Sequence, residues 1–343
     1  MKIAIHYKQG GFTERWIQYC KENNIEYKSV NCYDTDIIKQ LGDCEALLWH
    51  HHHADYKDKL FAKQLLFSLQ QAGKKVFPDF NTGWHFDDKV GQKYLLESIH
   101  APLVPSYVFY TKEEAIKWAK ETSFPKVFKL RGGAGAENVR LVKNEREAKK
   151  LISKAFGKGF RQYNAINNLK ERWRKYQLGK STFIDILKGI TRLVCPTTFS
   201  RLYSPEKGYV YFQDFIPDNK TDYRIKIVNG KCWGFQRKVR TDDFRASGSD
   251  VLIFDNSLIP IEMIRISFDV YQKLFFKSIA FDFVVKESQP LIVEISYCFG
   301  FEEQQLSNGY WTKDLMWHEG AFNPFGWMIE SIKDSSEFEI SNK

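Results

Sequence analysis

A lysine inside an apolar strand is the first residue whose position suggests chemistry. Lys129 lies in the apolar run 127–130, directly before the turn Arg131-Gly132-Gly133-Ala134-Gly135. Burying an ammonium group without an anion is costly, so Lys129 either meets an anion such as phosphate or extends to solvent at the strand end. Gly132, Gly133 and Gly135 can present backbone N–H groups to phosphate oxygens. The turn is not a P-loop, because no Gly-Lys-Ser/Thr ending follows it.

Two carboxylates stand in successive apolar segments further along the chain. Asp282 lies within residues 279–285 and Glu294 within 290–296, and a hairpin would bring both to one face of a sheet. Two embedded carboxylates repel each other unless a cation lies between them. This favours a divalent metal over a salt-bridged structural pair, and ligands that are all oxygen indicate Mg²⁺ or Mn²⁺ and not zinc.

Arginines occupy the segments between these two features. Arg224, Arg237 and Arg240 fall in residues 222–240, and Arg245 follows in the run Asp243-Phe244-Arg245-Ala246-Ser247-Gly248. Alternating charges on strands usually mark a solvated face. Arginines that converge on two carboxylates and a lysine can instead stabilise charge on a phosphoryl group in transfer.

The elements that must position these residues change in pattern along the chain. Strand-like and helix-like segments alternate over the first eighty residues, which predicts a parallel α/β sheet. From residue 209 the pattern becomes antiparallel, with Asn229-Gly230 as a hairpin turn. We expect an α/β chain with α+β lobes: an amino-terminal domain (1–86), a glycine-rich lid subdomain (87–212) with a basic helical insertion (about 157–207), a catalytic antiparallel-sheet subdomain (213–335) and a tail (336–343).

Composition excludes several classes of protein. The 343 residues are 43% apolar and 16% aromatic, enough for a sizeable core. No secretory leader is visible, and no apolar run approaches the roughly 20 residues of a membrane helix. Six scattered cysteines without a Cys-x-x-Cys pair indicate small buried hydrophobes in a reduced, cytoplasmic protein. The net charge of +9 is matched by residues 154–207, where twelve lysines and arginines face three acidic residues.

The order of the candidate residues resembles the ATP-grasp superfamily of ligases. The resemblance rests on Asp88-Lys89, Lys129 with its glycine-rich turn, Gln213-Asp214-Phe215-Ile216, Asp222-x-Arg224, Arg237, Asp282 and Glu294-x-Ser296. The run from Asp214 to Arg245 is most similar to the ribosomal-protein glutamate ligases. The similarity covers residues 87–301, and the first eighty residues resemble the α/β domain that precedes the ATP-grasp part. It implies an enzyme that uses ATP and Mg²⁺, with Mn²⁺ as an alternative.

The resemblance also implies a role for each residue. Lys89 and Lys129 would hold the α- and β-phosphates, and the glycine-rich loop would close over the triphosphate as a mobile flap. Gln213, Asp214, Phe215 and Ile216 would meet adenine, and Asp222 the ribose. Asp282, Glu294 and Ser296 would hold the metal. The catalytic arginines would be Arg224, Arg237 and Arg245, with Ser247 near the acceptor substrate.

Two positions depart from the family pattern. The family usually has asparagine two residues after the last metal-binding glutamate, whereas this chain has Ser296, a shorter and weaker oxygen ligand. The adenine segment opens with Gln213 where glutamate is common. The expected activity is ligation of a carboxylate to an amine through an acyl-phosphate, but a catalytically weak nucleotide-binding relative stays open.

Four histidines, 50–53, follow the strand-like residues 46–49. They form either a metal site or a loop that faces substrate at the carboxyl end of a parallel strand, and we favour the loop, with His50 and His51 facing substrate. Trp84 is expected to line the same crevice. Residues 84–89 resemble relatives encoded with bacterial polysaccharide assembly, which suggests a uronic-acid carboxylate joined to an amino acid. The alternative is an amino-acid or peptide ligase that acts on small soluble substrates.

The basic insertion leaves two interpretations open. It is either an amphipathic segment that docks on an anionic membrane or polyanion, so that the enzyme is peripheral at the inner face of the membrane, or a solvated helical excursion. Docking would suit a glycan-linked substrate. A nucleic-acid partner is disfavoured, because the charge avoids the Asp282 and Glu294 site and no nucleic-acid-binding motif is present.

Overall fold

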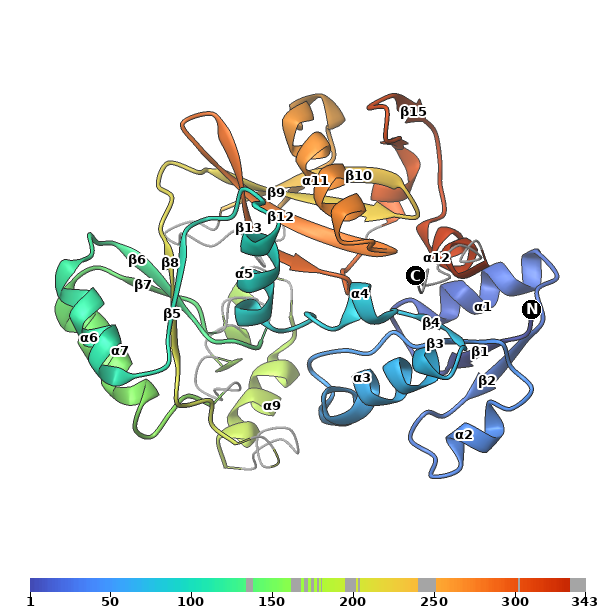
Figure 1. Ribbon diagram of the computed structural model, residues 1–343, viewed down its shortest axis with the longest axis horizontal. Coiled ribbons are helices and arrows are strands. Elements are labelled where there is room, and N and C mark those ends of the chain that lie inside the picture. The colour runs from blue at the N-terminus through green and yellow to red at the C-terminus, as the bar shows by residue number, and fades with distance from the viewer. Residues whose placement is uncertain are drawn as a thin grey trace, which may run out of the picture.

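The computed structural model of the protein describes residues 1–133, 138–161, 168–169, 172–173, 176–177, 179, 181–194, 202, 204–239, 251–301 and 303–333. Three sheets, each with its own helices, make up three lobes (Figure 1). Within the described residues no helix is long and apolar enough to cross a membrane.

The amino-terminal lobe is a parallel α/β sheet, as the alternating pattern predicts. Its four strands run in the order β2-β1-β3-β4, and the pairs are parallel. They are β1 (Ile3–His6), β2 (Tyr27–Val30), β3 (Ala46–Leu48) and β4 (Lys75–Phe77), with helices α1 (Thr13–Glu22), α2 (Ile37–Gln40), α3 (Tyr56–Gln71) and α4 (Phe80–Gly83). The carboxyl ends of β1 and β3 lead into the loops at residues 7–12 and 49–55.

The small lobe is an antiparallel sheet covered by two helices. Its strands run in the order β5-β8-β6-β7: β5 (Ser106–Phe109), β6 (Lys126–Lys129), β7 (Arg140–Val142) and β8 (Val210–Asp214). Helices α6 (Lys112–Glu121) and α7 (Glu145–Ala155) pack on one face, where Phe128 and Phe212 meet Ala119 and Ile152. Helix α9 (Phe183–Val194) belongs to the basic insertion and confirms a helix there.

The large sheet carries most of the residues expected to do chemistry. Its order is β13-β12-β9-β10-β14-β15, with β11 beside β10. The strands are β9 (Thr221–Val228), β10 (Lys231–Lys238), β11 (Leu252–Ile253), β12 (Ser278–Lys286), β13 (Gln289–Ser296), β14 (Gly309–Trp311) and β15 (Trp317–Glu319). Asn229 and Gly230 have φ angles of 45° and 71°, the left-handed turn that their sequence predicts. Helix α11 (Ile261–Lys273) covers the face opposite the cavity described below.

Helix α5 (Lys89–Ser98) lies in a different part of the fold from the one that the sequence predicts. We expected residues 87–98 in the lid subdomain, but α5 packs on β13, and Leu96 lies in the same core as Ile292. The small lobe therefore begins near β5. The reason is side-chain burial: Leu96 finds apolar partners on the large sheet, and the sequence periodicity of a helix does not say which sheet it covers.

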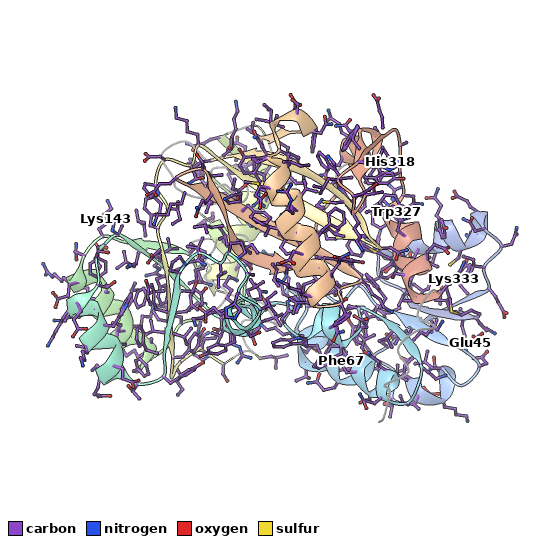
Figure 2. All side chains as sticks on the ribbon, turned by 45° about the horizontal axis from the view of Figure 1, so that its top comes forward. Glu45, Phe67, Lys143, His318, Trp327 and Lys333 are labelled. Carbon is purple, nitrogen blue, oxygen red and sulfur yellow. The ribbon has the colours of Figure 1, made fainter. Side chains whose placement is uncertain are left out.

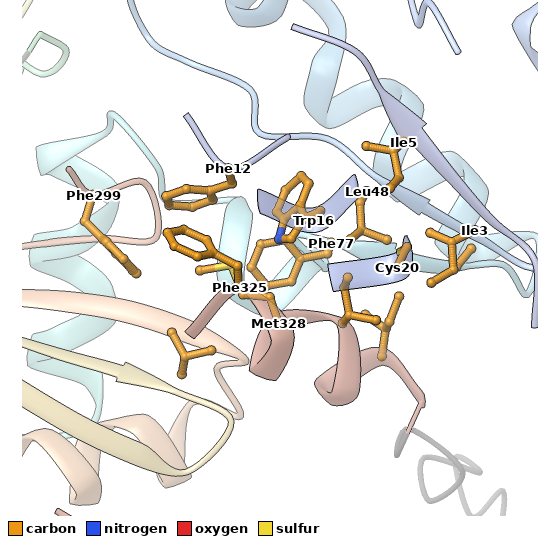
Figure 3. Packing of buried hydrophobic residues seen from close by; sticks show 14 of the residues in the cluster. Ile3, Ile5, Phe12, Trp16, Cys20, Leu48, Phe77, Phe299, Phe325 and Met328 are labelled. Carbon is orange, nitrogen blue, oxygen red and sulfur yellow. The ribbon is translucent and has the colours of Figure 1, made fainter. Parts of the chain in front are cut away.

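Helix α12 (Pro324–Lys333) joins the amino-terminal lobe to the large sheet. It packs on α1 and β4 and also contacts β9. Phe325 and Met328 share a core with Phe12, Trp16 and Phe77 (Figure 3). In Figure 2, Trp327 and Lys333 lie toward the end of the molecule that carries Glu45, and Lys143 lies at the other end. The two lobes are thus tied by one continuous apolar core.

Candidate active site

A cavity of about 1710 Å³ is lined by residues of all three lobes. Its floor is one face of the large sheet. Its small-lobe wall includes Lys129, Gly133 and Leu141, and the amino-terminal lobe contributes the loops at residues 8–12 and 52–57. Most of the chemically reactive side chains that the sequence suggests meet here.

Strand register brings the charged side chains to one face of the large sheet. Arg237 of β10 stands opposite Asp222 of β9, and Arg224 of β9 stands opposite Asp282 of β12. Asp282 in turn pairs with Glu294 of β13. Because side chains alternate along a strand, Ile225, which follows Arg224, points to the core on the other face of the sheet.

The arginines and aspartates form a connected array. Arg237 donates from Nε and Nη2 to the two carboxylate oxygens of Asp222, at 2.7 and 2.6 Å. Arg237 Nη2 also lies 3.1 Å from Asp282 Oδ1, and Arg224 donates two further bonds to Asp282. Burial by itself would raise the pKa of Asp282, but Arg224 and Arg237 hold it below the ordinary value. The carboxylate is therefore ionised, and the two guanidinium groups already offset its negative charge.

The array of arginines and aspartates removes one reason for expecting a metal ion. Repulsion between Asp282 and Glu294 does not require a divalent ion, because Arg224 and Arg237 bind Asp282 while Lys89 Nζ lies 3.1 Å from Glu294 Oε1. The Ser296 hydroxyl donates to the Cys298 carbonyl oxygen at 2.8 Å. Within the described residues no group of three His, Cys, Asp or Glu side chains could hold a metal ion. Metal binding by Asp282, Glu294 and Ser296 stays a prediction.

Lys129 lies buried on the cavity wall and does not extend to solvent. Its Nζ donates to Gln213 Oε1 at 2.6 Å, across the pairing of β6 with β8. Burial lowers the pKa of Lys129 to about 8, and Glu294 acts in the opposite direction without offsetting it. A neutral amide partner in place of a carboxylate leaves this ammonium ready to accept an anion.

Lys89 joins the glycine-rich turn to the carboxylates. Its Nζ donates to the Gly133 carbonyl oxygen at 2.8 Å, and its backbone N–H donates to the Arg131 carbonyl oxygen at 2.9 Å. Burial would lower the pKa of Lys89, yet the neighbouring Glu294 and Asp87 raise it above the ordinary value. Lys89 is therefore a cation held between two lobes.

Two further contacts fix the base of the glycine-rich turn. Asp87 Oδ1 accepts from the Gly133 N–H at 2.5 Å, and Arg131 pairs with Asp88. Gly133 has a φ of 98°, a conformation that favours glycine. The roles of Asp87 and Arg131 were not expected, although two aspartates directly before Lys89 are a visible signal. Gly132 is buried at the turn, and Gly135 lies outside the described residues.

The Gln213 and Asp214 side chains at the end of β8 are hydrogen-bonded within the protein beside the cavity. The Asp214 carboxylate accepts from Lys126 Nζ at 2.5 Å, and the Gln213 amide N–H donates to Ser106 Oγ at 3.1 Å. Both side chains are thus engaged within the protein. The cavity walls beside this strand end are apolar, and they comprise Val104, Val127, Leu141, Phe215, Ile216, Val284, Val293 and Ile295. Such a slot suits a flat aromatic base with backbone groups at its edge.

His50 lines the cavity as expected, but its ring is held by the protein. Its Nδ1 accepts from the Phe12 N–H at 3.2 Å, and its Nε2 lies 3.0 Å from Cys298 Sγ. The ring stacks on Phe12 with centroids 3.8 Å apart. Burial lowers the pKa of His50 to about 3, so the ring is neutral.

Two expectations for substrate contacts are wrong. His51 is 2% exposed and packs among Trp49, Phe86 and Tyr297, because alternation after β3 turns it away from the cavity. Trp84 stacks on Phe80 and is not a lining residue, whereas Phe86 is. Arg245 and Ser247 lie outside the described residues.

The amino-terminal end of the cavity contains residues that the sequence did not single out. Lys8 Nζ contacts Asp55 at 2.9 Å and the buried Asp58 at 3.2 Å. Asp58 also accepts from the His52 N–H at 2.8 Å, so one carboxylate positions two lining loops. The walls there are aromatic and polar, and they comprise Tyr33, His52, His53, Tyr56, Lys57, Phe86, Phe299 and Phe301.

The chain is similar to known proteins in part of its sequence and in its fold. The family model described as the carbamoyl-phosphate synthase L chain, ATP binding domain, matches residues 88–176. No curated protein matches the chain. The structure of a RimK domain protein ATP-grasp from Sphaerobacter thermophilus aligns with a TM-score of 0.57 at 14% identity, covering 97% of this chain and 99% of that one.

A ligase structure and a synthetase structure are also similar to this chain in fold. D-alanine–D-alanine ligase from Bacillus anthracis aligns with a TM-score of 0.54 at 14% identity, over 97% of this chain and 96% of that one. N5-carboxyaminoimidazole ribonucleotide synthetase from Thermotoga maritima aligns with a TM-score of 0.58 at 15% identity, over 97% and 75%. The likeness to these structures shows that the chain has the ATP-grasp fold. Its likeness to the glutamate-ligase branch stays a prediction.

Proposed function

We propose that this protein is an ATP-dependent, ADP-forming ligase that joins a carboxylate to an amine. The observation that carries the proposal is the convergence of Lys89, Lys129 and the Arg224–Arg237 array on one cavity beside two carboxylates. Cations aimed at one point stabilise a phosphoryl group in transfer, whereas a purely structural role would not need them around an open cavity.

The donor set fits MgATP. Two ammonium groups, Lys89 and Lys129, suit phosphates, and the apolar slot beside residues 214–216 suits a purine. Asp282 and Glu294 offer the hard oxygen atoms that Mg²⁺ prefers, and the same oxygens accept Mn²⁺. Bound MgATP would supply the phosphoryl group that converts a substrate carboxylate to an acyl-phosphate, from which an amine displaces phosphate.

The chain's own residues would bind the phosphates, orient the transferring group and shield the acyl-phosphate from water. Arg237 and Arg224 would stabilise negative charge on the transferring group, while Asp222 keeps Arg237 in position. Gly133 and its neighbours would cover the phosphates and exclude water, which protects an acyl-phosphate from hydrolysis. Arg245 and Ser247 are retained as proposed contacts to the acceptor.

The substrate is proposed to be larger than a single small amino acid. Support comes from the amino-terminal end of the cavity, where aromatic faces such as Tyr33, Phe86 and Phe301 alternate with His52, His53 and Lys57. Aromatic faces with interspersed polar groups suit a sugar ring. A uronic acid of a bacterial surface polysaccharide, joined to an amino acid by a cytoplasmic enzyme, is the substrate we favour, and small soluble amino acids or peptides are the alternative.

The test is ADP and phosphate release from MgATP across a panel of uronic acids and amino acids, with and without amines. The same panel is applied to Lys129→Met and Glu294→Gln, with Lys149→Met on the outer surface of α7 as the matched control. Turnover that needs both an acid and an amine, is lost in the two cavity variants and survives in the control would support the ligase. ATP binding without turnover would favour a catalytically weak nucleotide-binding relative, and failure to bind ATP would refute the proposal.

A further inference from the structure

Helix α9 exposes an apolar face that the described part of the chain leaves largely uncovered. Phe183, Ile184, Leu187 and Ile190 keep between 46% and 61% of their surface accessible. At about 100° per residue these four positions span an arc of roughly 120° on one side of the helix. Leaving four large apolar side chains in water on one helix face is unfavourable, so this face calls for a partner.

The opposite side of α9 is the one that packs on the protein. Ile186 is buried, and Gly189 lies so close to Leu169 and Arg172 that an added Cβ would come within 2.9 Å of either side chain. Arg172 also donates from Nη1 to the Asp185 carbonyl oxygen at 3.0 Å. The helix therefore has a fixed orientation, and its exposed apolar face is not simply a helix left unpacked.

Two aromatic side chains extend the apolar face beyond the helix. Trp173 and Tyr176 are 51% and 41% exposed. The ring of Tyr176 lies 6.2 Å from that of Trp173 and 6.3 Å from that of Phe183, measured between centroids. We call the surface made by Trp173, Tyr176, Phe183, Ile184, Leu187 and Ile190 the α9 surface. Tryptophan and tyrosine are the residues that favour the boundary between lipid and water.

The charge of the sequence segment that contains α9 indicates which partner fits the α9 surface. Residues 154–207 carry twelve lysines and arginines against three acidic residues. Lys188 stands at the flank of the apolar arc with 64% of its side chain accessible, and Asp185 is paired with Lys188 and Arg172. A water-soluble protein partner would not require so strong a positive excess, whereas an anionic lipid surface attracts it at about 1 kcal/mol for each cation near the surface.

We propose that the α9 surface docks this protein on an anionic membrane, with the apolar arc inserted among the headgroups and Lys188 at its flank on lipid phosphates. The geometry is that of an interfacial helix, which lies in the membrane plane and does not cross the bilayer. The surface shares no residue with the lining of the cavity, so its variants leave that lining unchanged. The proposal does not depend on ligase activity.

The experiment is co-sedimentation with phosphatidylcholine vesicles that contain or lack phosphatidylglycerol. We expect wild-type protein to bind the anionic vesicles only. Ile184→Asp with Leu187→Asp should weaken binding at least tenfold, and Lys188→Gln about fivefold. The matched control is Leu60→Asp on α3, a still more exposed leucine outside the α9 surface, which should bind as wild type does.

Three outcomes would overturn the proposal. They are failure of the wild type to bind anionic vesicles, equal loss in the Leu60→Asp control, and binding to a soluble polyanion that the Ile184→Asp with Leu187→Asp variant retains. A dimer of the wild type that this variant abolishes, without vesicle binding, would assign the surface to a second copy of the chain. ATP binding is measured on every variant, because retained affinity shows that the fold is intact and separates this test from that of the ligase.

Discussion

Arg224 binds Asp282 through two parallel hydrogen bonds, from Nε to Oδ1 and from Nη2 to Oδ2, each 2.7 Å long. Both carboxylate oxygens that would serve a metal are thus occupied by a guanidinium group. A divalent ion must either displace Arg224 or share Asp282 with it. The nucleotide-free protein should consequently bind divalent metal weakly.

Replacement of Arg224 by methionine tests this competition. We expect Arg224→Met to tighten Mn²⁺ binding in the absence of nucleotide by about tenfold, because an opposing positive charge is removed from beside Asp282. Ligase turnover should fall at the same time. Arg265→Met, which removes a surface arginine of α11 paired with Glu262, is the control. Calorimetric titration with Mn²⁺ gives the affinity, and equal affinities for wild type and Arg224→Met would show that the arginine does not compete.

ATP affinity should depend on pH through Lys129. Burial lowers the pKa of this ammonium to about 8, so it loses its proton as the pH rises through 8, and ATP phosphates prefer the protonated form. The dissociation constant for ATP should therefore increase above pH 8, by up to about tenfold per pH unit. Fluorescence titration between pH 7 and pH 9 measures it.

Two variants separate Lys129 from other titrating groups. Lys129→Arg keeps its charge throughout this range, so its ATP affinity should stay flat. Gln213→Glu places a carboxylate where Lys129 now meets an amide, which should raise the pKa of Lys129 and move the loss of affinity to higher pH. Parallel loss of affinity in wild type and Lys129→Arg would assign the dependence to another group.

Phe325 should be a key residue for stability, because its ring joins two lobes. Its centroid lies 5.4 Å from that of Phe12 and 4.7 Å from that of Phe301. Phe325→Ala should lower the free energy of unfolding by about 3–5 kcal/mol, from lost burial and the cavity left behind. Met316→Ala, at an exposed position, should change it by less than about 0.5 kcal/mol. Denaturant unfolding measures both, and a cost near that of the control would mean that α12 is not part of the shared core.

Cys298 should be an unreactive thiol although it contacts His50. Burial raises the pKa of Cys298 to about 12 and lowers that of His50 to about 3, so the pair is neutral. At pH 8 we expect alkylation by iodoacetamide about a thousandfold slower than for an unperturbed thiol, because the thiolate is the reactive form. Mass spectrometry of the modified peptide gives the rate. Rapid modification that His50→Ala abolishes would instead indicate a thiolate–imidazolium pair.

The sequence by itself determined the local features of the fold. Alternating strands and helices predicted the parallel amino-terminal sheet, and Asn229-Gly230 predicted the hairpin of β9 and β10, since both follow from interactions between near neighbours. The order of Lys89, Lys129, Arg224, Asp282 and Glu294 likewise predicted the ATP-grasp fold. Alternation and turn chemistry depend on residues close together in the chain, so the sequence shows them directly.

Only the tertiary structure decided how those residues meet. The sequence suggested a metal between Asp282 and Glu294, but strand register places Arg224 and Arg237 on Asp282, and helix α5, which packs on β13, brings Lys89 to Glu294. Tertiary packing also turns His51 into the core and places α5 on the large sheet. Each of these contacts joins residues far apart in the chain, and the partner of a charge or an apolar face is set by packing that no local pattern encodes.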